Sequence, residues 1–316
     1  MTELLDFQES VVIGIDVGGT NLRVGLVDEH GDLLDSYIVG TQQTLGGSDP
    51  MRSLADMLQS FISQSVVGRY HLRAIAIGFP SMVDETRRKV IRTTFIEGLQ
   101  NIDVVAGLNR FGVPVFIDRD VNMLLHYDAH RLHLPPKGVW LGCYVGTGMG
   151  FSLAFDGRIL VGKHGVAGEL GHIPGRTGLR CGCGNEGCIE TKTAGNALVA
   201  SLRERYGPDE PIEAVFVDHT DEPFIDEWLE YLAIGFSTAI NMLDPTAILV
   251  GGGVPQMSGF PKRRLEEKIR RMARKPVPEA DLHLTYLEQG PYDGVLGSAL
   301  CAFEALNTQD SKVLVS

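Results

Sequence analysis

Two stretches of the chain share one pattern, in which an apolar, β-branched strand runs into a glycine turn and a second apolar strand follows. The first stretch begins at Val11 and breaks at "GGTN", and the second begins at Val139 and breaks at "GTGMG". In each stretch a later turn, at Gly31 or at Asp156 and Gly157, leads into a third strand. The repeat therefore predicts two related halves, each of which starts as a three-stranded meander.

The rest of the chain alternates helical and strand-like segments. Apolar residues recur at helical spacing in some segments, whereas "RAIAIGFP", "PVFIDRDVN" and "TAILVGGG" are short apolar runs that end at glycine, proline or charged residues. This alternation predicts an α/β protein of two lobes with a cleft between them. The segments expected to be helical are 51–65, 123–132, 224–243 and 294–306.

The internal repeat also suggests where the lobes divide. We expect an N-terminal α/β lobe over residues 1–119 and a C-terminal α/β lobe over residues 120–294, which carries a cysteine-rich loop. The last helix, over about residues 295–316, is expected to pack back on the first lobe. A chain of 316 residues is long enough for two such cores.

Composition excludes several classes of function. The opening "MTELLDFQES" has no basic and apolar leader, and the apolar runs are too short to span a bilayer. We therefore expect a cytoplasmic protein with no membrane partner. The net charge of -12 argues against a surface that coats nucleic-acid phosphates, so no nucleic-acid partner is expected.

The loop "GELGHIPGRTGLRCGCGNEGC" contains His172 and three of the five cysteines, which are Cys181, Cys183 and Cys188. In a reducing compartment such a cluster is more typical of metal ligands than of disulfides. Cys₃His fills a tetrahedral zinc shell and leaves no position for a reactive water, so the loop predicts a structural zinc. A chance cluster of buried or redox thiols is the alternative. The loop also fits G-x-G-x-x-G, but no strand precedes it, so it is not a dinucleotide fingerprint.

Two glutamates flank this loop. Glu169 precedes His172 by one helical turn, and Glu190 follows the last cysteine closely. A pinned loop would hold both carboxylates near one imidazole, where they accept hydrogen bonds from neutral hydroxyls. The arrangement suggests a polyol or sugar site, and the alternative is that each glutamate is simply exposed to solvent.

The glycine turns suggest phosphate binding. "GIDVGGTN" places Asp16 at a strand end before a turn of small residues, "VGTGMG" repeats the arrangement, and "GGG" at residues 251–253 follows another strand. Glycines allow backbone N–H groups to approach an anion closely. No Walker sequence is present, so the two equivalent turns carry the prediction.

Asp120 follows the strand "VFID", where strand ends of α/β folds meet ligands. A carboxylate there can accept the proton of an attacking hydroxyl, and the alternative is a cap for the following helix. His126, His130 and His133 share one helical face. We interpret them as surface histidines and not as a second metal centre.

Several of these motifs together resemble the ROK family of sugar kinases and repressors, which have the actin-like ATPase (ribonuclease H-like) fold. They are Asp16-x-Gly18-Gly19-Thr20, "GTGMG", "GVAGELGH" and "CGCGNEGCIE". The resemblance runs from about Val11 to Leu306, and "INMLDPTAILVGGG" is similar to the helix, turn and strand around the family's nucleotide site. It implies an α/β fold of two lobes with a central cleft.

The resemblance also implies a role for individual residues. Asp120 matches the catalytic base that deprotonates the sugar hydroxyl, usually O6, and magnesium accompanies ATP. The expected sugar contacts are Arg119, Asn122, Glu169, His172 and Glu190, and His172 also joins Cys181, Cys183 and Cys188 as a zinc ligand. The expected nucleotide contacts are Gly14, Ile15, Asp16, Val17, Gly18, Gly19, Thr20, Asn21, Val145, Gly146, Thr147, Gly148, Met149, Gly150, Phe151, Ser152, Gly251, Gly252 and Gly253.

The sequence departs from the glucose and N-acetylmannosamine kinases of the family at the catalytic strand end. They usually carry Asn-Asp there, and this chain carries Arg119-Asp120. "RDVN", "YVGTGMGF" and "GKHGVAGELGHIP" resemble the D-allose kinase branch. The expected reaction is phosphorylation of D-allose at its 6-hydroxyl by ATP. The alternative is a glucokinase or another ROK kinase of a hexose or N-acylhexosamine.

A sugar-sensing regulator without catalysis is a further alternative. The DNA-binding members of the family carry an additional N-terminal helix-turn-helix domain, whereas here the first strand is expected at Val11. A zinc-stapled sugar-binding module would not require a base at Asp120. The expected partners are therefore a hexose and ATP, with a homodimer possible.

Overall fold

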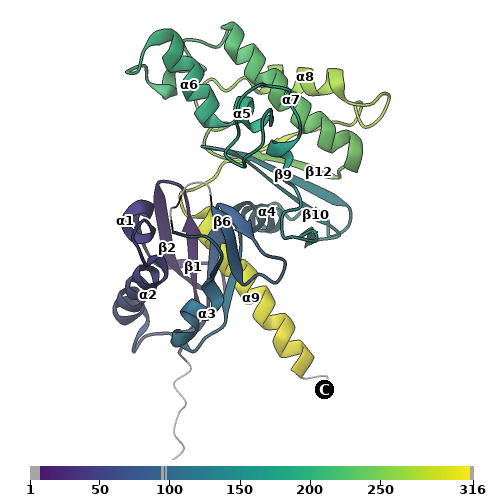
Figure 1. The fold of residues 1–316 in the computed structure, drawn as a ribbon. Helices are drawn as coiled ribbons and strands as arrows, with labels where there is room; N and C mark the ends of the chain where they lie inside the picture. Colours follow the sequence, from purple (N-terminus) through teal and green to yellow (C-terminus); the bar gives the residue numbers. More distant parts are fainter. Residues whose placement is uncertain (1–7, 94–95, 97, 314–316) are drawn as a thin grey trace, which may run out of the picture. The chain divides into compact units, whose positions relative to one another are not determined.

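The computed structural model describes residues 8–93, 96 and 98–313, which divide into two compact units. Unit 1 contains the described residues up to His133, Val161–Val166 and those from Gly290 onward. Unit 2 contains Leu134–Leu160 and Ala167–Gln289. Figure 1 labels the helices α1–α9 and several of the strands of both units.

The sheet of unit 1 has the strand order β3-β2-β1-β4-β8. Its first three strands pair antiparallel as the predicted meander, and the β1–β4 and β4–β8 pairs are parallel. A small antiparallel sheet, β5-β6-β7, follows β4 in the chain. The strands are β1 (Ser10–Val17), β2 (Asn21–Asp28), β3 (Leu33–Gly40), β4 (His71–Phe79), β5 (Ser81–Val83), β6 (Lys89–Thr93), β7 (Ile102–Asp103) and β8 (Val115–Arg119).

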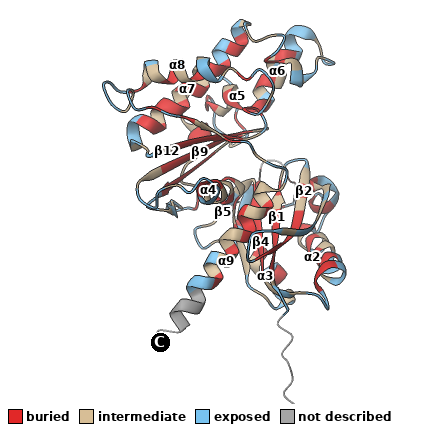
Figure 2. Ribbon diagram, turned by 180° about the vertical axis from the view of Figure 1, so that it is seen from behind, coloured by how far each residue is buried: buried red, intermediate tan, exposed pale blue. Residues whose placement is uncertain are grey.

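Helices cover both faces of this sheet. On one face Leu54 and Leu58 of α2 pack with alternate β1 residues such as Ile13 and Ile15. On the other face Val12 packs with residues of α9. Figure 2 shows the middle strands of this sheet as buried. The helices are α1 (Thr41–Leu45), α2 (Pro50–Phe61), a π-helical turn (Ile62–Val66), α3 (Val104–Leu108), a 3₁₀ turn (Asn109–Phe111), α4 (Asp120–Arg131) and α9 (Asp293–Val313).

The helix α4 belongs to unit 1, whereas the boundary expected from the sequence lies between residues 119 and 120. Gly78 of β4 allows close approach, because a Cβ there would lie 3.2 Å from Cα of Asp120. Likewise a Cβ on Gly297 of α9 would lie 2.5 Å from the carbonyl oxygen of Met123. Because α4 packs tightly on β4 and α9, the division falls after His133.

The sheet of unit 2 repeats the strand pattern of unit 1, with the order β11-β10-β9-β12-β13. The β9–β10 and β10–β11 pairs are antiparallel, and the β9–β12 and β12–β13 pairs are parallel. The predicted internal repeat is therefore confirmed, although the third strand of this meander has only two residues. The strands are β9 (Val139–Val145), β10 (Met149–Phe155), β11 (Arg158–Ile159), β12 (Ala247–Gly251) and β13 (Thr285–Tyr286).

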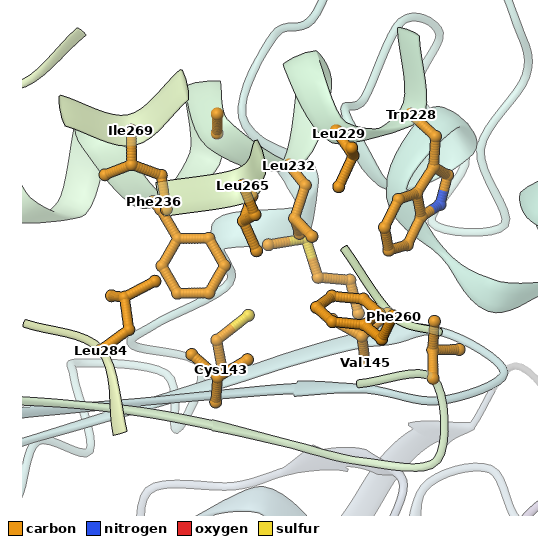
Figure 3. Close-up of a cluster of buried hydrophobic side chains, with 14 of the residues drawn as sticks. Cys143, Val145, Trp228, Leu229, Leu232, Phe236, Phe260, Leu265, Ile269 and Leu284 are labelled. Carbon is orange, nitrogen blue, oxygen red and sulfur yellow. The ribbon is translucent and has the colours of Figure 1, made fainter. Parts of the chain in front are cut away.

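The core of unit 2 lies between this sheet and two long helices. Figure 3 shows Cys143 and Val145 of the sheet facing Leu232 and Phe236 of α7, with Leu265 of α8 beside them. The helix α7 ends at Leu243, and the next residue, Asp244, adopts a left-handed conformation before Pro245. The helices are α5 (Glu190–Thr193), α6 (Gly195–Tyr206), α7 (Pro223–Leu243) and α8 (Lys262–Met272), with 3₁₀ turns at Leu170–His172 and Ile212–Ala214.

The predicted α/β class is confirmed, and each helix expected from the sequence forms. The one over residues 51–65 is divided into α2 and the π-helical turn, and α4 begins at Asp120, directly after β8. Among the described residues, no helix combines the length and apolarity needed to cross a bilayer.

Candidate functional site

The Cys/His loop of unit 2 gathers its four predicted ligands. One ligand atom from each of His172, Cys181, Cys183 and Cys188 lies within 4.8 Å of the others. Nδ1 of His172 is 3.6 Å from Sγ of Cys181, and the Sγ atoms of Cys183 and Cys188 are 3.7 Å apart. All three cysteines are free.

These separations fit zinc. A tetrahedral ion with bonds of about 2.3 Å to sulfur and about 2.0 Å to nitrogen keeps its ligand atoms roughly 3.5 to 3.8 Å apart. A disulfide needs about 2.05 Å between sulfurs. The donor set of three thiols and one imidazole is the closed shell typical of a structural zinc site.

Backbone hydrogen bonds fold the loop around these ligands. The amide of Gly187 donates to the carbonyl of Leu179 at 2.8 Å, and that of Cys181 donates to Asn185 at 2.9 Å. Gly184 and Gly187 both have positive φ, a conformation that costs glycine little. The glycines between the cysteines therefore permit the turns that bring the thiols together.

The two predicted glutamates lie on opposite sides of the His172 ring. Oε2 of Glu169 is 3.4 Å from Nε2, and Oε2 of Glu190 is 3.8 Å from Nδ1. The three side chains are 27% to 34% exposed. Nδ1 faces the thiol of Cys181, and Nε2 lies on the opposite side of the ring, beside Glu169. The geometry thus places two hydrogen-bond acceptors and an imidazole in one partly exposed patch.

The β9–β10 turn lies beside this patch. The Oε1 atom of Glu190 accepts a hydrogen bond from the amide of Met149 at 3.3 Å, and a Cβ on Gly148 would lie 3.1 Å from the same oxygen. The turn closes on itself through the amide of Gly146, which donates to Gly148 at 3.0 Å. Of the residues predicted to bind nucleotide here, four are buried in the two strands: Val145 in β9, and Met149, Phe151 and Ser152 in β10.

The "GGG" turn is brought against the end of β9. Gly252 has a φ of 93°, and a Cβ on it would overlap with the backbone of Val145. Its amide donates to Oε1 of Gln289 at 2.7 Å, and the amide of Val254 donates to Val145 at 3.0 Å. Gln289 is a residue that the motifs do not reveal, because no local pattern marks it.

The equivalent β1–β2 turn of unit 1 is closed differently. The amide of Gly18 donates to Asn21 at 2.9 Å, and the Thr41 hydroxyl donates to the carbonyl of Gly18 at 2.6 Å. Nη1 of Arg23 lies 3.4 Å from Oδ2 of Asp16. Burial raises the pKa of Asp16, and Arg23 opposes that rise. Sequence reasoning missed Arg23, the cation beside this turn.

The predicted contacts before this turn lie inside β1. Ile15 and Val17 are fully buried in the core. A Cβ on Gly14 would overlap with the carbonyl of Val295 in α9, so glycine is required there for packing. A Cβ on Gly294 would lie 2.6 Å from Cγ of Asp16, so the first turn of α9 also abuts that carboxylate.

Asp120 begins α4 directly after β8, as predicted, and its Oδ1 accepts a hydrogen bond from the amide of Val121 at 2.8 Å. The neighbouring Arg119 and Asn122 are buried. Asn122 donates through Nδ2 to Oδ1 of Asp118 at 2.7 Å. The structure therefore brings Asp120 to a partly exposed strand end, next in sequence to buried polar side chains.

Asp118 and Arg87 form the part of this group that sequence reasoning missed. Nη2 of Arg87 lies 3.1 Å from Oδ1 of Asp118. Burial raises the pKa of Asp118, while Arg87 and the hydrogen bond from Asn122 lower it. Asp118 interrupts an apolar strand, and that interruption is the signal in the sequence that marks it.

The three histidines near α4 do not form a cluster of metal ligands. His126 contacts Glu304 of α9, with Nε2 2.7 Å from Oε2. The metal-type cluster found among the described residues is the one formed by His172 and the three cysteines.

Comparison with known proteins identifies the family. The chain matches the ROK family over residues 12–305, and it therefore belongs to that family. It is 28% identical over 313 residues to the N-acetyl-D-glucosamine kinase of Aliivibrio salmonicida, an alignment that covers 90% of this chain and 97% of that enzyme. It is also 28% identical to the glucokinase of Streptomyces coelicolor over 273 residues, with coverages of 77% and 82%.

Solved structures agree with this assignment. The ROK family glucokinase of Streptomyces griseus, in complex with glucose and AMPPNP, has a TM-score of 0.75 at 25% identity and covers 93% of this chain and 99% of its own. The ROK hexokinase of Thermus thermophilus has a TM-score of 0.74 at 28% identity, with coverages of 94% and 99%. The predicted actin-like ATPase fold is thereby confirmed.

Proposed function

We propose that the chain is an ATP-dependent kinase of a free hexose or N-acetylhexosamine. The observation that carries the proposal is the convergence of Glu169, His172 and Glu190 beside the Cys/His cluster. Carboxylates and a neutral imidazole nitrogen suit the hydroxyl groups of an uncharged sugar. The related glucokinases and N-acetylglucosamine kinase act on such sugars.

In the proposed reaction Asp120 is the general base. Its carboxylate takes the proton of the sugar 6-hydroxyl while that oxygen forms a bond to the γ-phosphorus of ATP. The bond between the γ-phosphorus and the bridging oxygen breaks, and ADP leaves with the bonding electrons. Asp120 is partly exposed at the start of α4, so its carboxylate is accessible to a hydroxyl.

The acceptor is bound by hydrogen bonds in this proposal. Glu169 and Glu190 accept from sugar hydroxyls, and Nε2 of His172 contacts the sugar because Nδ1 faces the thiols. Zn²⁺, when bound by His172 and the three cysteines, fixes the orientation of the imidazole and of the loop. Arg119 and Asn122 are the further sugar contacts.

The glycine turns hold the phosphates. In this proposal backbone N–H groups of the β1–β2 and β9–β10 turns bind the phosphates, because glycines leave little side-chain obstruction, and the residues at 251–253 belong to the same proposal. Asp16, a carboxylate at the end of β1, is the type of ligand that Mg²⁺ takes when it accompanies ATP.

The comparisons favour the broader substrate class over D-allose. The relatives reported above are glucokinases, a hexokinase and an N-acetylglucosamine kinase, and none of them is an allose kinase. D-Allose is therefore supported by the Arg119-Asp120 pair and by the resemblance of "YVGTGMGF" and "GKHGVAGELGHIP" to the D-allose kinase branch. A longer donor in place of an amide is a means of recognising the inverted C3 hydroxyl.

Release of ADP in the presence of different sugars tests the proposal. The panel contains D-glucose, N-acetyl-D-glucosamine, N-acetyl-D-mannosamine and D-allose, with a sugar-free control. We expect ADP release with at least one of them and none without sugar, and product analysis should place the phosphate on O6. Binding of a sugar without any ADP release would instead support a regulator.

The Arg119→Asn variant tests whether Arg119 selects between allose and glucose. If Arg119 selects for allose, the ratio of kcat/KM for allose to that for glucose falls by about tenfold in the variant, the size of one lost charged hydrogen bond. An unchanged ratio would remove Arg119 from substrate selection and leave the kinase proposal intact.

A further inference from the structure

We propose that the Cys/His cluster controls nucleotide affinity, because it holds the β9–β10 turn in place through the segment formed by residues 190–196. The inference rests on the proposed nucleotide-binding role of this turn. All of the residues involved belong to unit 2.

The cluster fixes the start of this segment. Cys188 is a ligand, and its carbonyl accepts hydrogen bonds from both the amide and the hydroxyl of Thr191, at 3.2 and 2.7 Å. The amide of Ile189 donates to Ile173, which follows the ligand His172, at 3.1 Å. The first turn of α5 is therefore anchored on both sides by the folded loop.

The other end of the segment holds the turn. The amides of Gly195 and Asn196 donate to the carbonyls of Gly146 and Thr147, at 2.9 and 3.1 Å. A Cβ on Gly195 would overlap with the carbonyl of Gly146, so the two backbones are in direct contact.

Two side chains of α5 contact the other flank of the turn. The amide of Met149 donates to Oε1 of Glu190 at 3.3 Å. The hydroxyl of Thr193, which is fully buried, donates to the sulfur of Met149 at 3.1 Å. The segment therefore touches both flanks of the turn.

Glu190 connects the two features directly. One carboxylate oxygen contacts the turn, and the other lies 3.6 Å from Sγ of Cys181 and 3.8 Å from Nδ1 of His172. Glu169 contacts the same imidazole at its other nitrogen. Both carboxylates therefore contact His172. Glu190 differs in that it also accepts a hydrogen bond from the amide of Met149 in the turn.

The sequence of the turn explains why it needs this support. "GTGMG" has three glycines, and glycine loses the most backbone freedom when it is ordered. Within the turn the amide of Gly146 donates to Gly148, and the carbonyls of Gly146 and Thr147 are held by the segment. If the support is lost, the nucleotide must supply the ordering free energy when it binds, so its affinity falls.

Titration calorimetry with MgADP in the absence of sugar tests the proposal. The full chain is compared when loaded with Zn²⁺, after removal of metal by a chelator, and after Zn²⁺ is added back. We expect Kd to rise by about tenfold on metal removal, the equivalent of one or two hydrogen bonds, and to recover on reloading.

Variants separate a positioning role from general loss of structure. Glu190→Ala, with its zinc content measured, should weaken MgADP binding by about fivefold, and the matched Glu169→Ala should not. If Glu190→Ala fails to retain zinc, Thr193→Val takes its place, because it removes a hydroxyl that contacts the turn and leaves the ligands unchanged.

The possible outcomes are distinct. If the zinc-loaded wild type does not bind MgADP, the proposed function fails. If the wild type binds but the metal-depleted protein and the variants bind equally well, the nucleotide assignment stands and the role of the segment is wrong. Equal losses in Glu190→Ala and Glu169→Ala would also contradict the proposal, because the effect would then pass through His172 and not through the turn.

Discussion

The two glycine turns occupy equivalent places in equivalent sheets, yet their supports differ. The β1–β2 turn of unit 1 is held by neighbours in its own unit, namely Thr41 and the ion pair of Asp16 with Arg23. The β9–β10 turn of unit 2 is held by a segment that leaves the Cys/His loop. The same strand pattern is therefore supported in unit 1 by side chains close to the sheet and in unit 2 by the loop that carries the Cys/His cluster.

The difference shows how a repeated fold acquires unequal halves. Strand order and glycine turns are common to both units. They define the shared framework of the two sheets and do not distinguish one unit from the other. The polar groups proposed to act on the sugar come from features that are not repeated. Asp120 follows β8 in unit 1, while Glu169 and Glu190 flank the metal loop in unit 2.

The largest expected effects are on the kinetic constants, and they distinguish Asp120 of unit 1 from Glu169 of unit 2. Asp120→Asn removes the proposed base and should lower kcat by about 10³-fold while the sugar KM changes little. Glu169→Gln removes one acceptor from the sugar and should raise KM by about tenfold. Steady-state kinetics checks both, and a wild-type kcat in Asp120→Asn would exclude Asp120 as the base.

Close backbone packing at glycines should give the next largest effect. Gly252→Ala places a Cβ against the backbone of Val145 at a φ of 93°, and we expect it to lower the free energy of unfolding by about 3 kcal/mol. Gly253→Ala has no atom within 4 Å of the added Cβ and should be nearly neutral. Urea unfolding checks the pair, and equal stabilities would contradict the packing argument.

A partly buried ion pair in unit 1 should produce a smaller, pH-dependent effect. Burial raises the pKa of Asp118 and Arg87 opposes the rise. A carboxyl group whose pKa is raised by folding favours the folded state below its unfolded pKa, and this contribution is lost as pH rises through the folded pKa. Arg87→Met removes the charge that opposes this rise, so the pKa of Asp118 in the folded state rises further. The free energy of unfolding that is lost at neutral pH is then larger.

We therefore expect Arg87→Met to cost about 2 kcal/mol near neutral pH, and less in acid. Urea midpoints measured at about pH 4.5 and about pH 7.5 give the comparison. A cost that is constant with pH would mean that Arg87 stabilises the fold by packing alone.

The ion-pair network of unit 2 should give the smallest effect. Nζ of Lys268 lies 2.9 Å from Asp226 and 2.8 Å from Glu230. The hydrogen bond from Lys268 lowers the pKa of Asp226, so this stabilisation is present above the unfolded pKa and is lost as pH falls through the folded one. Both carboxylates are more than a third exposed.

Lys268→Met should therefore cost only about 0.5 to 1 kcal/mol at neutral pH, and less as the carboxylates become protonated. Thermal melting at the two pH values checks this. A larger cost in acid than at neutral pH would contradict the assignment.

The fold was largely predictable because its signals are local. Apolar strands, helical periodicity and turn glycines predict the elements, and their repetition predicts two similar sheets. The division at His133 was not predictable, since α4 joins unit 1 through contacts with Gly78 and Gly297 that lie far apart in the sequence. The gathering of the four candidate zinc ligands was predictable because thiols and glycines lie together in one loop.

The less local parts of the site could not be read from motifs. Gln289 supports Gly252 from another segment, and Arg87 reaches Asp118 from a hairpin turn. No spacing rule connects such pairs. The roles of Asp120, Arg119 and Asn122, the nucleotide contacts and a homodimer stay predictions.

Hydrogen exchange of the two glycine turns tests the central claim most directly. Backbone amides of residues 18–21 and 146–150 are followed in the zinc-loaded and metal-depleted chain, with those of α8 as a check that unit 2 stays folded. The account predicts faster exchange on metal removal in the β9–β10 turn and unchanged exchange in the β1–β2 turn. Unchanged exchange in both turns, or equal acceleration in both, would contradict it.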